Sequence, residues 1–334
     1  MRIPRGIRIR AAAVAALTVT AVLAGCADAA PPAAPPSSPA AVVGLTYIPN
    51  IQFAPFYVAD HEGFYTTDAS VSLRHHGASE GLFTAMAAGE EDFVVAGGDE
   101  ILQARAQGVD IVAVASYYGR YPARIIVPQG SPIVSAADLR GRTVGIPGKF
   151  GENWFALLIA LEQAGLSESD ITVAEIGYTQ QAALTTGKVD AVIGFANSDV
   201  LSFQAGGFPV TAIDPEVPLV SICLATTGAY ASAHPEVVSA VVAGMKKGME
   251  TSLTDEDTTL SIAADYIPSF RGDTLATAKI VLPATTALFL GSGGVVSPPL
   301  DPAQWAGMAR AMESVGLIPD GTDETGAYTN QYAN

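Results

Sequence analysis

Residues 187–194, Gly-Lys-Val-Asp-Ala-Val-Ile-Gly, decide the fold, because residues 89–96, Gly-Glu-Glu-Asp-Phe-Val-Val-Ala, repeat their pattern. In each stretch a glycine ends a predicted amphipathic helix, an aspartate follows three residues later, and a short apolar run predicts a buried strand. The two copies keep a constant offset of 98 positions. Two βαβ units can share such punctuation without being related, but the common register favours two lobes of similar design.

The same offset extends upstream. Residues 47–50, Tyr-Ile-Pro-Asn, end one predicted strand and residues 145–148, Gly-Ile-Pro-Gly, end another, with prolines again 98 positions apart. Parallel strands are buried on both faces and are rich in valine and isoleucine, as Val94-Val95 and Val192-Ile193 are. We therefore expect an α/β fold.

Ligands of such sheets bind beyond the carboxyl ends of the strands. This rule selects residues 50–56 and 97–100 in the first lobe and 148–154 and 195–199 in the second, and lobes that face each other would enclose one cleft. The candidate ligand-binding residues there and in the predicted hinge are Tyr47, Asn50, Gln52, Phe53, Phe56, Gly98, Asp99, Tyr118, Phe150, Glu152, Asn153, Trp154, Phe195 and Asn197.

Aromatic faces combined with amide and carboxyl groups suit a polar planar heterocycle. Lys149 leaves an anionic ligand as an alternative, because a lysine beside a helix N-terminus could hold a sulfonate or a phosphate. The run Gly148-Lys149-Phe150-Gly151 lacks the full spacing of a phosphate-binding loop. Each aromatic residue could also be a filler of the core.

The first 40 residues predict a leader and a tether. Four arginines and an apolar run end at Leu23-Ala24-Gly25-Cys26, the layout of a lipoprotein signal over residues 1–25 with acylation at Cys26. Residues 26–40 are rich in proline and alanine and predict an extended tether. The remaining chain would be held on the extracytoplasmic face of a cell membrane by its lipid.

The charge is strongly acidic. The whole chain carries −16, and loss of residues 1–25, with four arginines and no acid, leaves −20. Such a field disfavours nucleic acid as a partner. About 290 residues follow the tether, a size for two domains.

Residues 47–65 resemble the opening signature of solute-binding proteins of ABC importers for nitrate, sulfonates, taurine and thiamine precursors. The similarity continues in the Gly97-Gly98-Asp99 loop and in residues 138–145 and 187–191, and it covers about residues 44 to 315. Residues 49–52 and 195–197 are most similar to the branch that binds thiamine pyrimidine precursors and riboflavin.

The resemblance implies a type II periplasmic-binding fold, with two βαβ lobes joined by two hinge crossings. Lobe 1 would comprise residues 41–117 and 225–334, and lobe 2 residues 118–224. The partners implied are a small-molecule solute and an ABC permease subunit, with no cofactor, and a monomer would suffice. The function implied is capture of riboflavin or a thiamine pyrimidine precursor by hinge closure; a sulfonate, taurine or nitrate is the alternative.

An enzyme is the less favoured alternative. A pyrimidine synthase of the same fold carries a cysteine-rich iron-linked motif, whereas this chain has only Cys26 and Cys223. We expect Cys223, in an apolar run, to be buried and unreactive. No zinc motif appears, and adjacent side chains on a strand point to opposite faces, so we expect a solvated or loop location for His75 and His76 rather than a metal site. At the C-terminus, residues 321–334 are expected to fray.

Overall fold

The computed structural model describes residues 40–77 and 80–333. The predicted signal peptide, the acylated Cys26 and all but the last residue of the predicted tether lie outside these residues. None of the helices within them is both long and apolar enough to cross a membrane.

The first sheet has the strand order β2-β1-β3-β10-β4. β1 is parallel to β2 and to β3, whereas β10 is antiparallel to β3 and to β4. The strands are β1 (Ala40–Leu45), β2 (Ser70–His75), β3 (Phe93–Gly97), β4 (Val112–Ser116) and β10 (Ile222–Thr226).

The second sheet repeats this plan with the order β7-β6-β8-β5-β9. β6 is parallel to β7 and β8, and β5 is antiparallel to β8 and β9. Its strands are β5 (Ala123–Pro128), β6 (Thr143–Ile146), β7 (Thr172–Glu175), β8 (Ala191–Phe195) and β9 (Val210–Ile213). The chain therefore passes between the sheets twice, over residues 117–122 and 214–221. The α/β fold class is confirmed.

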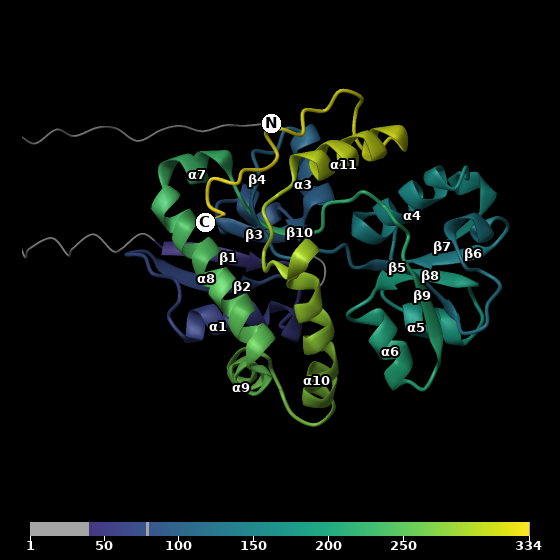
Figure 1. Cartoon of the computed structure of the whole chain (residues 1–334), viewed down its shortest axis with the longest axis horizontal. Coiled ribbons are helices and arrows are strands. Elements are labelled where there is room, and N and C mark those ends of the chain that lie inside the picture. Colours follow the sequence, from purple (N-terminus) through teal and green to yellow (C-terminus); the bar gives the residue numbers. More distant parts are fainter. Residues whose placement is uncertain (1–39, 78–79, 334) are drawn as a thin grey trace, which may run out of the picture. The chain divides into compact units, whose positions relative to one another are not determined.

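Helices alternate with the strands and then dominate the C-terminal third (Figure 1). The α-helices of the first two thirds are α1 (Ala54–His61), α2 (Thr84–Ala87), α3 (Gly98–Ala106), α4 (Gly151–Gln163), α5 (Gln180–Thr185) and α6 (Asp199–Ala205). Those that follow β10 are α7 (Gly228–Ala233), α8 (Pro235–Thr254), α9 (Glu256–Tyr266), α10 (Asp273–Thr286) and α11 (Pro302–Ser314). Short 3-10 helices are η1 (Ile51–Phe53), η2 (Ala136–Leu139), η3 (Glu168–Asp170), η4 (Ala287–Phe289) and η5 (Ser292–Gly294).

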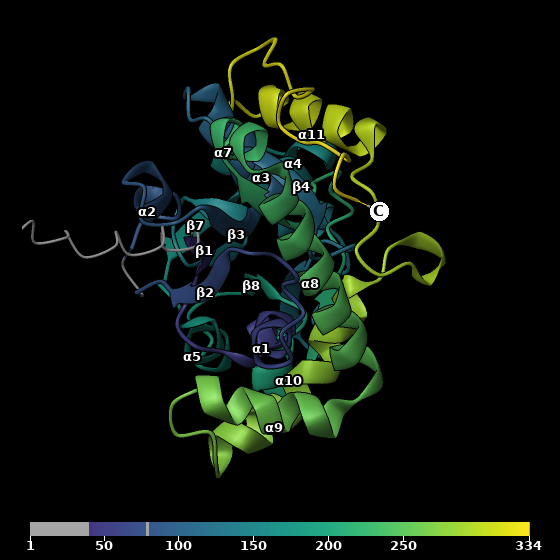
Figure 2. The ribbon, with the colours of Figure 1, turned by 90° about the vertical axis from the view of Figure 1, so that its left-hand side faces the viewer.

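The apolar residues form three cores. One lies between the first sheet and α1, α8 and α9, where α8 runs alongside α1 (Figure 2). A second is continuous from the first sheet to α4 of the second lobe and includes Trp154, Trp305 and the buried Cys223. The third lies on the α5 and α6 side of the second sheet. Burial of Cys223 is confirmed, and burial raises the pKa of its thiol.

The expectation that residues 321–334 fray is wrong for the part that is described. The amide of Thr329 donates to the carbonyl of Ala113, and the Asn330 side chain pairs with both backbone groups of Leu300. The hydroxyl of Tyr332 donates to the carbonyl of Ala231 at 3.0 Å. These partners lie far away in the sequence, so composition alone could not reveal that the segment packs.

Candidate functional site

A cavity of about 430 Å³ lies between the loop after β1 and the loop after β8. Asn50 and Gln52 line one side of it, and Asn197, Ser198 and Ser202 line another. The rest of the lining comprises Pro49, Ile51, Ile267, Phe270, Asp273, Thr274, Thr277, Ala278 and Val281. Its volume is in the range of small-molecule sites.

Asn197 lines this cavity and carries an unsatisfied polar atom among the described residues. Its side chain is almost fully buried, and its Nδ2 donates to Thr285 Oγ1 of α10 at 3.0 Å. Its Oδ1 is buried and has no hydrogen-bond partner among the described residues. A buried acceptor without a partner costs about 1–3 kcal/mol. A bound molecule that donates a hydrogen bond would remove this penalty.

The loop that carries Asn50 is held by two residues that sequence reasoning missed. The hydroxyl of Tyr57 lies 3.3 Å from the amide of Asn50 and 3.2 Å from its carbonyl, and it hydrogen-bonds His75 Nε2 at 3.0 Å. His75 Nδ1 in turn contacts the carbonyl of Tyr47 at 2.9 Å. Burial raises the pKa of Tyr57 and lowers the pKa of His75, so both stay neutral at pH 7. The Asn50 side chain accepts from the amide of Gln52 at 3.1 Å.

The charge of the lining is negative. Asp273 is the one charged residue that lines the cavity, and no lysine, arginine or histidine does so within the described chain. Lys149 lies on the surface instead, where it pairs with Glu168 and sits 5.5 Å from the ring centroid of Trp154. The lining therefore offers hydrogen bonds but no positive charge to balance an anion.

Most of the predicted aromatic residues are not part of the lining of this cavity. Phe53, Phe56, Tyr118 and Trp154 are buried, and Phe56 packs on Tyr117 with ring centroids 5.1 Å apart. In this position they fill the cores rather than the lining. Their role in binding stays a prediction.

Two further predicted aromatics are exposed where strands of different sheets end. Tyr47 follows β1 and is 36 % exposed, and Phe150 follows β6 and is 58 % exposed. Tyr178, which sequence reasoning missed, follows β7 and is 66 % exposed. Burial, with smaller contributions from Tyr47 and Glu100, raises the pKa of Tyr178. Phe195 is half-buried at the end of β8.

Gly98, Asp99, Glu152 and Asn153 lie at the N-termini of α3 and α4. They do not line the 430 Å³ cavity. The two helix ends are in contact with each other at the junction of the lobes. The predicted site residues thus separate into a cavity group, an exposed aromatic group, a core group and a junction group.

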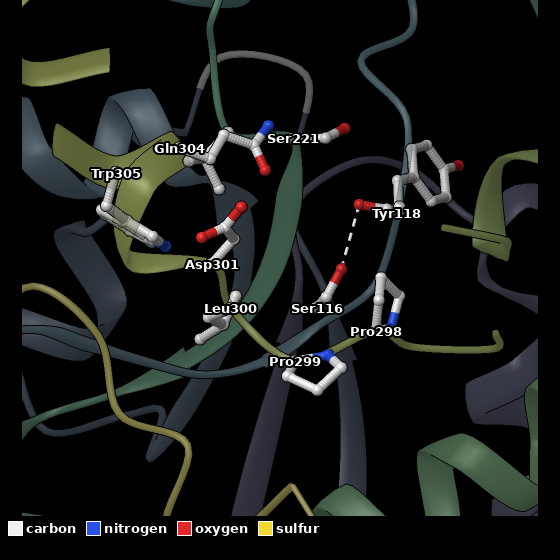
Figure 3. Close-up of a pocket in the computed structure, with 11 residues that line it drawn as sticks. Ser116, Tyr118, Ser221, Pro298, Pro299, Leu300, Asp301, Gln304 and Trp305 are labelled. Carbon is white, nitrogen blue, oxygen red and sulfur yellow. Dashed lines mark hydrogen bonds between the residues drawn. The ribbon is translucent and has the colours of Figure 1, made fainter. Parts of the chain in front are cut away.

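A second pocket lies beside the two segments, residues 117–122 and 214–221, that connect the sheets (Figure 3). It is lined by Ser116, Ser221, Gln304 and Trp305 among others, and its volume of about 30 Å³ suits about one water molecule. Within it, Ser116 Oγ donates to the carbonyl of Tyr118 at 3.0 Å, and Trp305 Nε1 is buried without a partner. This pocket is too small for a heterocycle.

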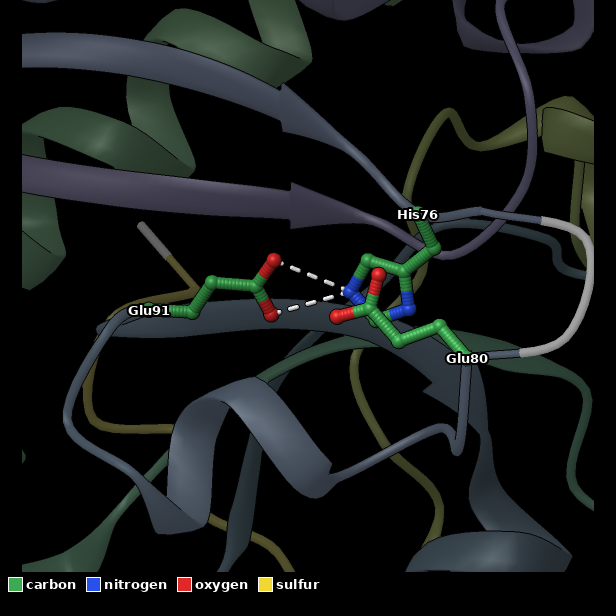
Figure 4. A group of neighbouring side chains, drawn as sticks. All are labelled: His76, Glu80 and Glu91. Carbon is green, nitrogen blue, oxygen red and sulfur yellow. Dashed lines mark hydrogen bonds and ion pairs between the residues drawn. The ribbon is translucent and has the colours of Figure 1, made fainter.

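His76 follows β2 in a loop, which is one of the two expected locations, but it is not solvated (Figure 4). His76 is 3 % exposed, and its Nε2 donates to both oxygens of Glu91 at 2.9 and 3.0 Å. With Glu80 these side chains place three potential metal ligands within 4.8 Å. However, Arg74 already pairs with Glu91 at 2.6 Å and with Glu80 at 2.8 Å. Because a guanidinium occupies both carboxylates, the cluster is explained as a buried ion-pair network.

Comparison with known proteins identifies the family. Residues 50–258 match the family described as NMT1/THI5 like. The chain belongs to this family. It is 30 % identical to the riboflavin-binding protein RibY of Chloroflexus aurantiacus over 87 % of this chain and 85 % of that protein. The resemblance to the precursor- and riboflavin-binding branch is thereby confirmed.

Other members and fold neighbours differ in what they do. A 4-amino-5-hydroxymethyl-2-methylpyrimidine phosphate synthase of Legionella pneumophila is 22 % identical over 86 % of this chain and 90 % of that protein. The structure of the aliphatic sulphonate-binding protein SsuA of Escherichia coli superposes with a TM-score of 0.68 at 19 % identity, covering 86 % of this chain and 91 % of that one. The latter similarity shows the periplasmic-binding fold of this family member.

Proposed function

We propose that this chain captures riboflavin or a related uncharged planar heterocycle between its lobes and delivers it to the permease of an ABC importer. The observation that carries this proposal is the 430 Å³ cavity, whose lining among the described residues includes Asn197, with a side-chain oxygen that has no partner there, and no basic side chain. Donor groups of such a ring system would pair with Asn197 Oδ1, and the apolar residues of the 267–281 segment would cover one of its faces.

A sulfonate or nitrate fits this lining poorly. Such an anion has no hydrogen to donate to Asn197 Oδ1, and Asp273 is the charged neighbour it would meet. Burying an unpaired charge costs more than binding can repay. The similarity to RibY over most of the chain supports the same choice.

An enzymatic role has little support in the residues that would carry it. Cys223 is buried, and its thiol has a raised pKa. With Cys26 assigned to lipid attachment, Cys223 is the single cysteine left, too few for a cysteine-rich iron site. The proposed role is therefore that of an extracytoplasmic binding protein, anchored through Cys26, that catalyses no reaction.

The proposal is tested by the rise in melting temperature with riboflavin, an aminopyrimidine thiamine precursor, taurine and nitrate, because a ligand of the native state stabilises it. We expect a rise with riboflavin. A rise confined to the aminopyrimidine would move the assignment to a pyrimidine precursor, and a rise confined to taurine or nitrate would overturn it.

Two variants locate the site. Asn197→Ala removes the free acceptor and should weaken riboflavin binding about tenfold, the size of one lost hydrogen bond. Gln204→Ala, on the exposed side of the adjoining α6, is the matched control and should bind as the parent does. Equal affinity of both variants would place the solute elsewhere.

A further inference from the structure

Two helices from different lobes contact each other at their N-termini. α3 begins directly after β3 of the first sheet, and α4 begins after β6 of the second. A Cβ on Gly97 would lie 3.3 Å from Glu152 Cγ, and a Cβ on Gly151 would lie 3.1 Å from Glu100 Oε1. Each helix therefore sends a carboxyl side chain to a glycine of the other lobe.

Asp99 completes this group, and Asp99, Glu100 and Glu152 are called the acid cluster below. Asp99 Oδ2 accepts from the hydroxyl of Tyr121 at 2.7 Å, and Glu100 Oε2 accepts from the amide of Gly97 at 3.1 Å. Glu152 is 8 % exposed, and its Oε1 is buried with no hydrogen-bond partner in the described part of the chain. An ionised carboxylate in that position would lack the hydrogen bonds that it needs.

No cation balances the acid cluster among the described residues. None of its members takes part in an ion pair. Three metal-ligating side chains have ligand atoms within 4.8 Å of one another at His76, Glu80 and Glu91, and the acid cluster does not reach this spacing. A proton is the remaining means of neutralising the cluster.

The electrostatics agree with this geometry. Burial raises the pKa of Asp99 to about 7, and burial together with the charge of Asp99 raises the pKa of Glu100 to about 8. Burial raises the pKa of Glu152 well above its ordinary value. The other titratable groups that face the cluster are Tyr118 and Tyr121 from the 117–122 crossing, Cys223 from β10 and Tyr178 after β7, and all have a raised pKa. They stay neutral, so none compensates a second negative charge.

We propose that the acid cluster is a proton-dependent latch between the lobes: the contact of α3 with α4 forms with protonated carboxyl groups, and deprotonation favours separation of the helix ends. Separation would expose the carboxyl groups to water, where they ionise in their ordinary range of about 4. The contact binds more protons than the separated state. Closure is therefore most favourable at low pH and weakens as pH rises from about 4 to about 8.

This inference extends the closure on which the proposed function rests, but its test needs no solute. Small-angle scattering of the ligand-free full chain is recorded from pH 5 to pH 9. We expect the radius of gyration to increase with pH. Glu152→Gln keeps the shape of the side chain without a titrating proton, and it should lose at least half of this increase. Glu162→Gln, an exposed substitution on the same helix, should behave as the parent.

Infrared spectroscopy provides the second measurement. At pH 7 the parent should show the carbonyl stretch of protonated carboxyl groups, and Glu152→Gln should lose part of that band, whereas Glu162→Gln should keep it. A radius of gyration that does not change with pH, or a Glu152→Gln variant that follows the parent in both measurements, would overturn the latch. Failure of riboflavin to bind would overturn the proposed function and leave these results unaffected.

Discussion

The segments β1–β3 and β6–β8 have the same backbone arrangement but differ in the side chains that are buried at matching positions. Gly89 and Gly187 both have positive φ, at 71° and 69°, where glycine is favoured. The amides of Asp92 and Asp190 donate to the carbonyls of Val42 and Thr143, and their carboxylates accept from the amides of the same two residues. The repeat therefore extends to individual hydrogen bonds.

The difference lies one residue before each aspartate. Glu91 and Val189 are 98 positions apart and both buried, but Glu91 forms an ion pair with Arg74 and hydrogen bonds with His76, whereas Val189 joins an apolar cluster. Facing them, Gly44 lies against Glu91 and Gly145 against Val189 and Ile176. The same backbone arrangement thus accommodates either a charged or an apolar side chain at this position, provided that the facing residue is a glycine.

The largest expected effects come from aromatic residues at matching positions of the first helix in each segment. Phe56 and Trp154 are 98 positions apart and both lie in a core. Phe56→Ala and Trp154→Ala should each lower the free energy of unfolding by about 4 kcal/mol, measured by urea denaturation. A small loss at Trp154 together with weaker solute binding would instead assign this residue to the site.

The next largest effects are expected at Glu91 and Val189, where the losses of stability should differ. Glu91→Ala leaves Arg74 and His76 without their buried carboxylate and should cost about 3 kcal/mol. Val189→Ala removes only two methyl groups and should cost about 2 kcal/mol. Urea midpoints of the two variants measure the difference, and a larger loss at Val189 would contradict this account of the ion-pair network.

Substitution of the facing glycines should follow the same order, with a larger loss of stability at Gly44, which faces Glu91, than at Gly145, which faces Val189. A Cβ at Gly44 would lie 2.2 Å from Glu91 Oε2, whereas a Cβ at Gly145 would lie 2.8 Å from Ile176 Cδ1, the end of a flexible side chain. Gly44→Ala should cost about 2 kcal/mol and Gly145→Ala about 1 kcal/mol in the same denaturation assay. Equal costs would show that the carboxylate moves as freely as the methyl group.

Asp99 and Asn197 also occupy matching positions, one ionisable and one not. Because burial raises the pKa of Asp99 to about 7, the folded state binds more protons than the unfolded state, and stability falls as pH rises from about 4 to about 7. Asp99→Asn should therefore gain about 1 kcal/mol relative to the parent at pH 8, and this gain should vanish at pH 4. A gain that is the same at both pH values would have another cause.

The smallest effect is expected at Lys149, whose matching position in the first segment is the buried Ile51. Lys149→Ala removes an exposed ion pair with Glu168 and should leave both the urea midpoint and solute affinity unchanged. Weaker binding of any anion by this variant would reinstate the anion-binding alternative.

The sequence determined the repeat and hence the fold. The 98-residue register, the glycine that ends each helix and the buried runs after Asp92 and Asp190 were all readable, because local periodicity reflects which face of an element is buried. The cavity residues Asn50, Gln52 and Asn197 followed from the rule that ligands bind at strand ends.

Only the tertiary structure decided which side chains meet. The pairing of His76 with Glu91, the contact of Tyr57 with His75 that supports Asn50, and the contact of Glu152 with Gly97 join residues 15 or more positions apart. Likewise, an aromatic residue shortly after a strand looks the same in a sequence whether it fills a core, as Trp154 does, or remains exposed, as Phe150 does. Such outcomes depend on the packing of distant segments, which local periodicity does not encode.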